Sequence, residues 1–450
     1  MKETFLKALR IFGIDGAIAY SSLARIITAA GGFLTIFIIA LSLSKVEQGY
    51  YYTFGSILAL QIFFELGLGG IIVQYVAYEA AKIKVNDNKQ LEGPQYNLSR
   101  LSSLFNLFIR WYGVISILFF IAVAIGGILF FRHNSQNADI SWESPWIMLC
   151  LFTAINLMIS PIIAFIEGMG QVKSIAKMRF IATSLSLMCG WTALLGGAGL
   201  YAPAIRTISS LAISIYFVLR IHRHLITGIW HQPKEECISY RKEIFPYQWR
   251  IALSWMSGYF IFQLFNPVLF AYCGASVAGQ MGMTLTALNG IFSLVLSWTS
   301  TKVPMWSKYI SLKDYPVLDA SVSSTLRQSS LVCFICLCIF WGFLYMLDIM
   351  HIGLAARFIP LTLAILLGST IFINNIINIW ATYLRCHKKE PFLIQAVIVG
   401  ICCAISTILG AKFFGLDGVV DGYTSIVVFF SLPLSFYIFR TKKREYQSGK

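Results

Sequence analysis

Polar residues inside long apolar runs are the positions where this sequence could do chemistry. Gln61 and Glu65 stand four residues apart in one such run, so they would share one face of a helix. Arg25 lies in an earlier run with no acidic residue close by on its own helix. A charge held in the middle of a bilayer costs about 2.5–3.5 kcal/mol on insertion scales, so such residues usually face a wet cavity or a partner. We therefore interpret Arg25, Gln61 and Glu65 as substrate-binding cavity residues.

Each of these residues also has a plainer interpretation. Arg25 could extend its side chain toward the cytoplasmic surface, although its depth makes this difficult. Glu65 could form a structural hydrogen bond between helices, pair with a cation such as Arg25, or titrate. A guanidinium group presents its donors in a fixed fork that suits phosphate oxygens, which favours Arg25 as a phosphate contact.

Asparagines form a second set of candidates. Asn266 precedes a proline in one apolar run, and Asn374 and Asn378 share a helix face in another. Asparagine in such runs either hydrogen-bonds between helices or lines a cavity, and both alternatives stay open. At the ends of runs, the further basic candidates for substrate contact are Arg206, Arg250 and Lys302.

Nothing in the sequence indicates an enzyme. The six histidines lack zinc-ligand spacing, and no Ser–His–Asp or paired-carboxylate arrangement can be assembled. Cys333 and Cys336 have no histidine or carboxylate nearby, so we interpret them as small buried hydrophobic residues. No polar connection exceeds about 30 residues, which leaves no room for a soluble catalytic domain. We expect no catalytic residue, metal or cofactor.

The composition predicts the elements that position these residues. Of the 450 residues, 57% are hydrophobic and 12% are charged, whereas a soluble domain has roughly 25% charged residues. The apolar residues form blocks of about 20 or more, the length of helix that crosses a bilayer core of about 30 Å. We predict an all-α integral membrane protein with about twelve spans, near residues 18–43, 50–78, 104–131, 146–168, 180–200, 204–220, 251–273, 279–301, 328–348, 358–384, 391–411 and 419–439.

The basic residues predict the orientation of these spans. Segments on the side of the N-terminus hold 28 Lys and Arg residues, whereas the opposite loops hold 4. Basic residues concentrate in cytoplasmic loops, so we expect both termini to be cytoplasmic. The net charge of +15 then indicates contact with anionic membrane lipids and not with nucleic acid.

The longest connection divides the chain into halves. It predicts a six-helix lobe at 1–220, a cytoplasmic connecting loop at 221–250, a second six-helix lobe at 251–440 and a basic tail at 441–450. Ile18-Ala19-Tyr20-Ser21 opens the first lobe and Ile251-Ala252-Leu253-Ser254 the second. This weak echo fits two pseudo-symmetric halves, as in parallel-repeat transporters, although chance similarity between apolar helices stays open.

Two stretches resemble a known family. The run Leu43-Ser44-Lys45-Val46-Glu47-Gln48-Gly49-Tyr50-Tyr51-Tyr52-Thr53-Phe54, continued by residues 61–68, resembles the first hairpin of Wzx-type O-antigen and polysaccharide flippases. Phe245-Pro246-Tyr247-Gln248-Trp249-Arg250-Ile251-Ala252, continued by Gly279-Gln280-Met281-Gly282-Met283-Thr284, resembles them too. These flippases belong to the multidrug/oligosaccharidyl-lipid/polysaccharide (MOP) exporter superfamily.

The resemblance implies two lobes around a central cavity that opens alternately to each side. It implies a substrate of an oligosaccharide on undecaprenyl pyrophosphate, a coupling ion (proton or sodium) and other polysaccharide assembly proteins as partners. Related flippases place an arginine of the first helix in the cavity, which Arg25 matches by position. The aligned position in the second half is Gly258, so a second phosphate contact would come from Arg250 or Lys302.

The expected function is therefore to move this lipid-linked unit from the cytoplasmic to the periplasmic leaflet of a bacterial inner membrane. The product would serve O-antigen or other surface polysaccharide synthesis, including lipopolysaccharide. A multidrug or metabolite cation antiporter of the same superfamily is the alternative, and it would need an acidic cation site but not Arg25. A membrane polymerase or ligase would need a large outer loop, which the sequence lacks.

Overall fold

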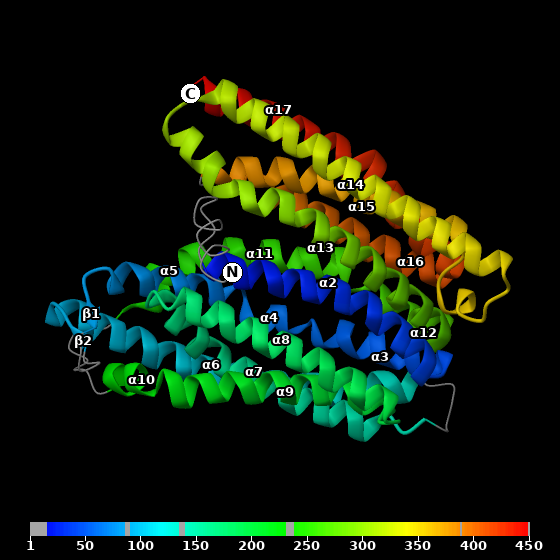
Figure 1. Ribbon diagram of the computed structural model, residues 1–450, viewed down its shortest axis with the longest axis horizontal. Helices are drawn as coiled ribbons and strands as arrows, with labels where there is room; N and C mark the ends of the chain where they lie inside the picture. The colour runs from blue at the N-terminus through cyan, green and yellow to red at the C-terminus, as the bar shows by residue number, and fades with distance from the viewer. Residues whose placement is uncertain (1–15, 86–90, 135–139, 231–237, 388, 449–450) are drawn as a thin grey trace, which may run out of the picture. The chain divides into compact units, whose positions relative to one another are not determined.

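The computed structural model describes residues 16–85, 91–134, 140–230, 238–387 and 389–448, which are almost entirely helical (Figure 1). The strands within these ranges are β1 (Lys84–Val85) and β2 (Leu91–Glu92), which pair antiparallel with Lys84 opposite Glu92. The prediction of an all-α protein is confirmed. Every predicted span falls mainly on helix.

In the first half of the chain, several helices are longer than the spans predicted for them. They are α2 (Gly16–Ser42), α3 (Lys45–Leu58), α4 (Gln61–Glu65), α5 (Leu68–Ala80), α6 (Gln95–Asn134), α7 (Glu143–Gly168), α8 (Val172–Leu195), η1 (Gly199–Tyr201), α9 (Ala202–Tyr216), η2 (Phe217–Ile221) and α10 (Arg223–Trp230). The predicted span 50–78 is broken after α4, where Leu66 and Gly67 have φ of 50° and 69°. Glycine adopts this left-handed backbone without a steric cost.

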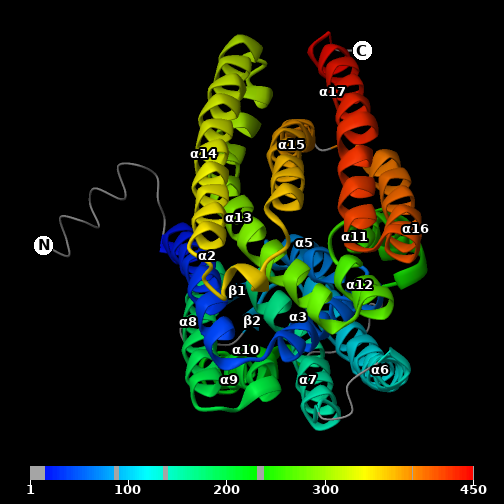
Figure 2. The same ribbon diagram turned by 90° about the vertical axis from the view of Figure 1, so that its right-hand side faces the viewer.

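The second half of the chain has longer helices. They are η3 (Tyr240–Ile244), α11 (Phe245–Phe262), α12 (Phe265–Cys273), α13 (Ala275–Ser311), α14 (Tyr315–Ile349), η4 (Ala355–Arg357), α15 (Leu361–Cys386), α16 (Leu393–Ser425), η5 (Ile426–Ser431) and α17 (Leu432–Gln447). The neighbours α13 and α14 run side by side (Figure 2). A kink at Gly415, with φ 63° and ψ −138°, interrupts α16 between the last two predicted spans.

Many of these helices suit a membrane. In the part of the chain that the structure describes, eight helical segments are long and apolar enough to cross one, and a bent pair formed by Lys45–Glu65 and Leu68–Ala80 raises this to nine. The segment Leu393–Gln447 counts once here, although the kink at Gly415 divides it into two predicted spans.

The chain packs as two compact units. Among the described residues, the first unit contains 16–28, 58–133 and 140–255, and the second contains 29–57, Asn134 and 256–448. The C-terminal part of α2 and nearly all of α3 therefore pack with helices of the second sequence half. The sequence did not indicate this grouping, and the predicted lobes 1–220 and 251–440 stay a prediction.

An ion-pair network ties the connecting segment to the first unit. Arg100 on α6 donates from Nε to Glu79 on α5 at 2.8 Å and from Nη2 to Glu243 on η3 at 2.7 Å. Asn97 donates to the second oxygen of Glu79 at 2.7 Å, and the Tyr75 hydroxyl donates to the backbone oxygen of Glu243 at 2.6 Å. The hydrogen bond from Arg100 lowers the pKa of the Glu243 carboxyl. This network positions the chain where it enters α11.

Candidate functional site: a polar cavity in the first unit

A polar cavity of about 620 Å³ lies within the first unit. Residues of α4, α5, α7, α8 and α9 line it. Its polar lining residues are Glu65, Gln74, Asn156, Ser160, Glu167, Arg179, Thr183, Ser210 and Ser214. Such a lining is unusual among helices whose other faces are strongly apolar, and it can hydrogen-bond a ligand that hydrocarbon would exclude.

The cavity extends from one end of the helices toward their middle. Along α7 its lining runs from Asn156 to Glu167, which spans about 16 Å at 1.5 Å per residue. Glu167 is next to the last residue of α7, and Arg179 lies in the second turn of α8. The basic-residue pattern predicts that this end faces the cytoplasm. The length of about 16 Å is about half the thickness of a bilayer core of about 30 Å.

Opposite charges meet at that end of the cavity. Arg179 donates to both carboxylate oxygens of Glu167, with 2.6 Å from Nη2 to Oε2 and 3.2 Å from Nη1 to Oε1. The Arg179 side chain is 54% exposed and that of Glu167 is 19% exposed. In the sequence, Arg179 is one of the 28 basic residues on the side of the N-terminus and was not a site candidate. The signal that could have found this pair is an acidic residue and a basic residue flanking a short turn at Gly170 between two apolar runs.

Glu65 lines the same cavity nearer the middle of the span. Gln61, one turn earlier on α4, hydrogen-bonds its side chain. The shared face that their spacing predicted is therefore present. The third residue of this set, Arg25, lies on α2 in the first unit, but its side chain is outside the described residues.

The candidate asparagines belong to the second unit and make helix-to-helix contacts. Asn266 on α12 is buried and donates to the Ser56 hydroxyl on α3 at 3.0 Å. Asn374 on α15 donates to the Tyr423 hydroxyl on α16 at 3.1 Å. Asn378 lies one turn further along α15. The structure thus places Asn266 and Asn374 in interhelical hydrogen bonds, the first of the two alternatives that the sequence left open.

The candidate basic residues are dispersed. The aliphatic part of Arg206 on α9 lies over Gly190 of α8, where a Cβ atom would be 2.4 Å from its Cγ. Arg250 on α11 lies over the Trp249 ring, with 5.5 Å from Cζ to the ring centre. Lys302 was expected at a helix end, but α13 continues to Ser311, so Lys302 lies inside that helix. None of the three is among the residues that line the cavity.

Parts of the two stretches with the family resemblance, residues 43–54 and 279–284, meet in the second unit. Gln48 is buried and donates from Nε2 to the backbone oxygens of Gly279 at 2.8 Å and Arg357 at 3.1 Å. Gly49 and Gly279 allow α3 and α13 to approach closely, because a Cβ at Gly279 would lie 3.2 Å from the Cα of Gly49. Gln48, Gly49 and Gly279 therefore hold helices together, whereas Glu65, in the continuation of the first stretch, lines the polar cavity.

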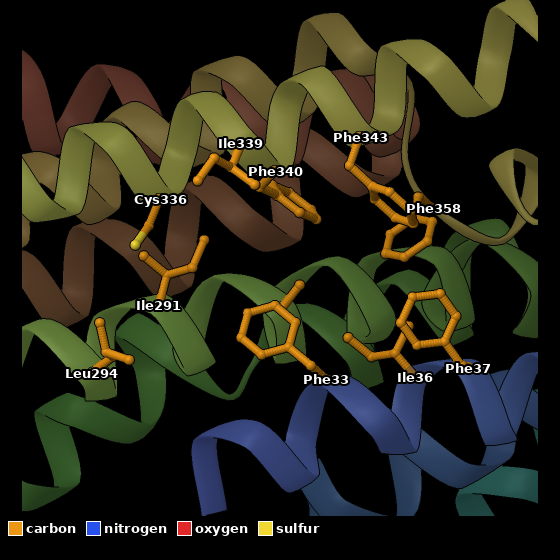
Figure 3. A pocket seen from close by; sticks show the side chains of 11 residues that line it. Phe33, Ile36, Phe37, Ile291, Leu294, Cys336, Ile339, Phe340, Phe343 and Phe358 are labelled. Carbon is orange, nitrogen blue, oxygen red and sulfur yellow. The ribbon is translucent and has the colours of Figure 1, made fainter. Parts of the chain in front are cut away.

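A second, apolar groove of about 300 Å³ lies between α2, α13 and α14 of the second unit (Figure 3). Aromatic side chains dominate it, with Phe33 and Phe37 on one side and Phe340 and Phe343 on the other (Figure 3). It offers a ligand no polar side chain apart from the thiol of Cys336. Such a lining suits hydrocarbon, so the groove is not a candidate site for a charged or hydroxylated group.

Several solved structures have a fold similar to that of this chain. No protein-family model matches the sequence, and no curated protein sequence is significantly similar to it. The lipid II flippase MurJ in an inward closed conformation aligns over 94% of this chain and 87% of its own, with a TM-score of 0.60 and 15% identity. An inward-facing multidrug resistance MATE family transporter of the MOP superfamily aligns over 94% of this chain and 95% of its own, with a TM-score of 0.57 and 12% identity.

A third structure, the MATE multidrug transporter DinF-BH, aligns over 96% of both chains with a TM-score of 0.55 and 13% identity. The chain therefore has the fold of these multi-pass α-helical membrane proteins. The predicted fold class is confirmed. The more specific resemblance to Wzx-type flippases stays a prediction.

Proposed function

We propose that this protein is a flippase that moves a lipid-linked oligosaccharide from the cytoplasmic to the periplasmic leaflet of a bacterial inner membrane. The polar cavity within the first unit carries this proposal. A pyrophosphate and several sugars cannot cross hydrocarbon unaided, because buried charge and unpaired hydroxyls are costly. A cavity whose length is about half the thickness of the bilayer core supplies polar partners along that path, while a polyprenyl tail can stay in lipid.

The proposed substrate contacts lie in the first two predicted spans. Arg25 would engage the pyrophosphate, and Glu65 and Gln61 would line the path of the head group. A proton or sodium gradient would supply the coupling ion, and other polysaccharide assembly proteins would receive the product. The MurJ fold, shared with this chain at low identity, supports a lipid-linked substrate.

Complementation of a flippase-deficient strain tests this function. We expect the wild-type chain to restore surface polysaccharide and Arg25→Ala to abolish it at normal membrane abundance. Arg25→Lys should retain part of the activity, because charge persists while the bidentate fork is lost. Arg132→Ala is the matched control, since its pair with Glu143 is exposed and outside the cavity. Full display by the Arg25→Ala variant would remove Arg25 from the mechanism.

Export of organic cations is a second candidate function, and the charge of the cavity favours it. Among the lining residues that the structure describes, the charged ones are Glu65, Glu167 and Arg179, which sum to a formal charge of −1. A cation antiporter would protect cells from a cationic dye, would require Glu65, and would tolerate Arg25→Ala. Dye accumulation measured in cells that express Glu65→Gln and Arg25→Ala separates the two functions.

A further inference from the structure

The charges in the first-unit cavity are not evenly distributed along its length. Among the lining residues that the structure describes, Arg179 is the one cationic residue, and it lies at the predicted cytoplasmic end. The opposite end holds Glu65 and Asn156. A phosphate group would be repelled by the Glu65 carboxylate when that group is ionised, whereas at the other end it would meet a guanidinium group. The two ends of the cavity therefore differ in the sign of the charge that they present to a phosphate group.

Arg179 already holds an anionic group in the geometry that a phosphate would use. Its two terminal nitrogens each donate to one oxygen of Glu167, and guanidinium binds carboxylate and phosphate in the same paired manner. More than half of the Arg179 side chain is exposed, so a second anion can approach it.

The rest of the lining suits uncharged hydroxyl groups. Gln74 and Asn156 supply amide donors and acceptors, and Thr183 and Ser210 supply hydroxyls. Neither amide side chain has a hydrogen bond to another described residue. Sugar hydroxyls both donate and accept, so they can pair with such groups without bringing in charge.

We infer that this cavity binds the lipid-linked head group in one orientation, an inference that rests on the proposed function. The pyrophosphate replaces Glu167 on Arg179 at the cytoplasmic end, and the sugars extend toward Asn156 and Glu65. Glu167 then acts as an internal competitor that occupies Arg179 until substrate arrives. This site is made within one unit of the protein, and Arg179 adds a pyrophosphate contact to the one proposed for Arg25.

Equilibrium binding to the purified full-length protein in lipid nanodiscs tests the inference. The probes are undecaprenyl pyrophosphate, the same lipid carrying one N-acetylglucosamine, and undecaprenol, which has no phosphate. Arg179→Gln should weaken binding of both pyrophosphate probes about tenfold or more, because each loses a charge-assisted hydrogen bond. Glu167→Gln should strengthen binding of the same probes several-fold, because the competing carboxylate is gone. Asn156→Leu should weaken only the sugar-bearing probe.

Arg179→Gln and Glu167→Gln should change probe binding in opposite directions. This distinguishes a role of the pair in binding from a role in folding stability. If the pair only stabilised the fold, Arg179→Gln and Glu167→Gln would both lower thermal stability and both weaken binding. That result would overturn the inference. Arg132→Gln breaks another Arg–Glu pair of the same unit, outside the cavity, and should leave binding unchanged. Equal effects of Asn156→Leu on both pyrophosphate probes would overturn the placement of the sugars.

The proposed function fails separately from this inference. If the wild-type protein binds neither pyrophosphate probe more tightly than undecaprenol, both the flippase proposal and the binding mode are contradicted. If wild type binds them and Arg179→Gln binds equally well, only the binding mode is wrong.

Discussion

The Arg357 guanidinium donates a hydrogen bond of 3.1 Å to the Gln48 side chain, although the two residues lie 309 positions apart. Arg357 also donates to the backbone oxygen of Ala40 on α2 at 3.1 Å. Gln48 returns a hydrogen bond to the Arg357 backbone. These reciprocal contacts join the ends of α2 and α3 to η4, and they account for a basic residue in a loop where few basic residues occur.

Close helix packing next to Gln48 predicts a strong effect of one added methyl group. A Cβ at Gly49 would lie 1.9 Å from the backbone oxygen of Ala275, whereas a Cβ at Gly55 on the same helix has nothing within 4 Å. Gly49→Ala should lower the free energy of unfolding by about 1–3 kcal/mol. Gly55→Ala should be neutral or stabilising by up to about 1 kcal/mol. Thermal unfolding of both purified variants checks this, and equal melting temperatures would contradict it.

Removal of Arg100 should destabilise the first unit. Glu79 is only 5% exposed, so Arg100→Leu would leave its carboxylate buried with Asn97 as its remaining partner. We expect a loss of about 3 kcal/mol in the free energy of unfolding. Arg132→Leu removes an exposed pair with Glu143 and should cost about 0–1 kcal/mol. Comparable losses in the two variants would show that the Arg100 network is not stabilising.

The Glu243 carboxylate predicts a pH-dependent stability. Its hydrogen bond from Arg100 lowers its pKa below the ordinary value of 4.5. Because the folded-state pKa is the lower one, the stabilisation is complete above pH 4.5 and is lost as the pH falls through the folded-state pKa. The difference in melting temperature between wild type and Glu243→Gln should therefore be constant from pH 7 to about 5.5 and shrink at more acidic pH. A difference that grows on acidification would have the wrong sign.

Glu65 should be accessible to water. Glu65→Cys, in a variant without other cysteines, should react with a membrane-impermeant thiol reagent applied to open membranes, because Glu65 lines the polar cavity. Leu68→Cys is the control, since Leu68 is fully buried on the neighbouring turn. Protection of both cysteines in every condition would favour a structural hydrogen bond as the role of Glu65.

The orientation of the chain is testable without a structure. Reporter fusions after Gln136 and after Gln232 should report opposite sides of the membrane, with Gln232 cytoplasmic, as the split of basic residues predicts. Reporters on the same side would refute the twelve-span topology, and a periplasmic Gln232 would reverse the orientation of the cavity.

Hydropathy and charge in the sequence alone determined that this protein is a helical membrane protein, because span length and apolar composition are local properties of the chain. The i, i+4 spacing of Gln61 and Glu65 likewise predicted their shared face. Only the tertiary structure decided that Arg179 meets Glu167 inside a cavity and that α3 packs with the second unit. Apolar helices offer similar surfaces to many partners, so their choice of neighbour depends on contacts between distant residues such as Gln48 and Arg357.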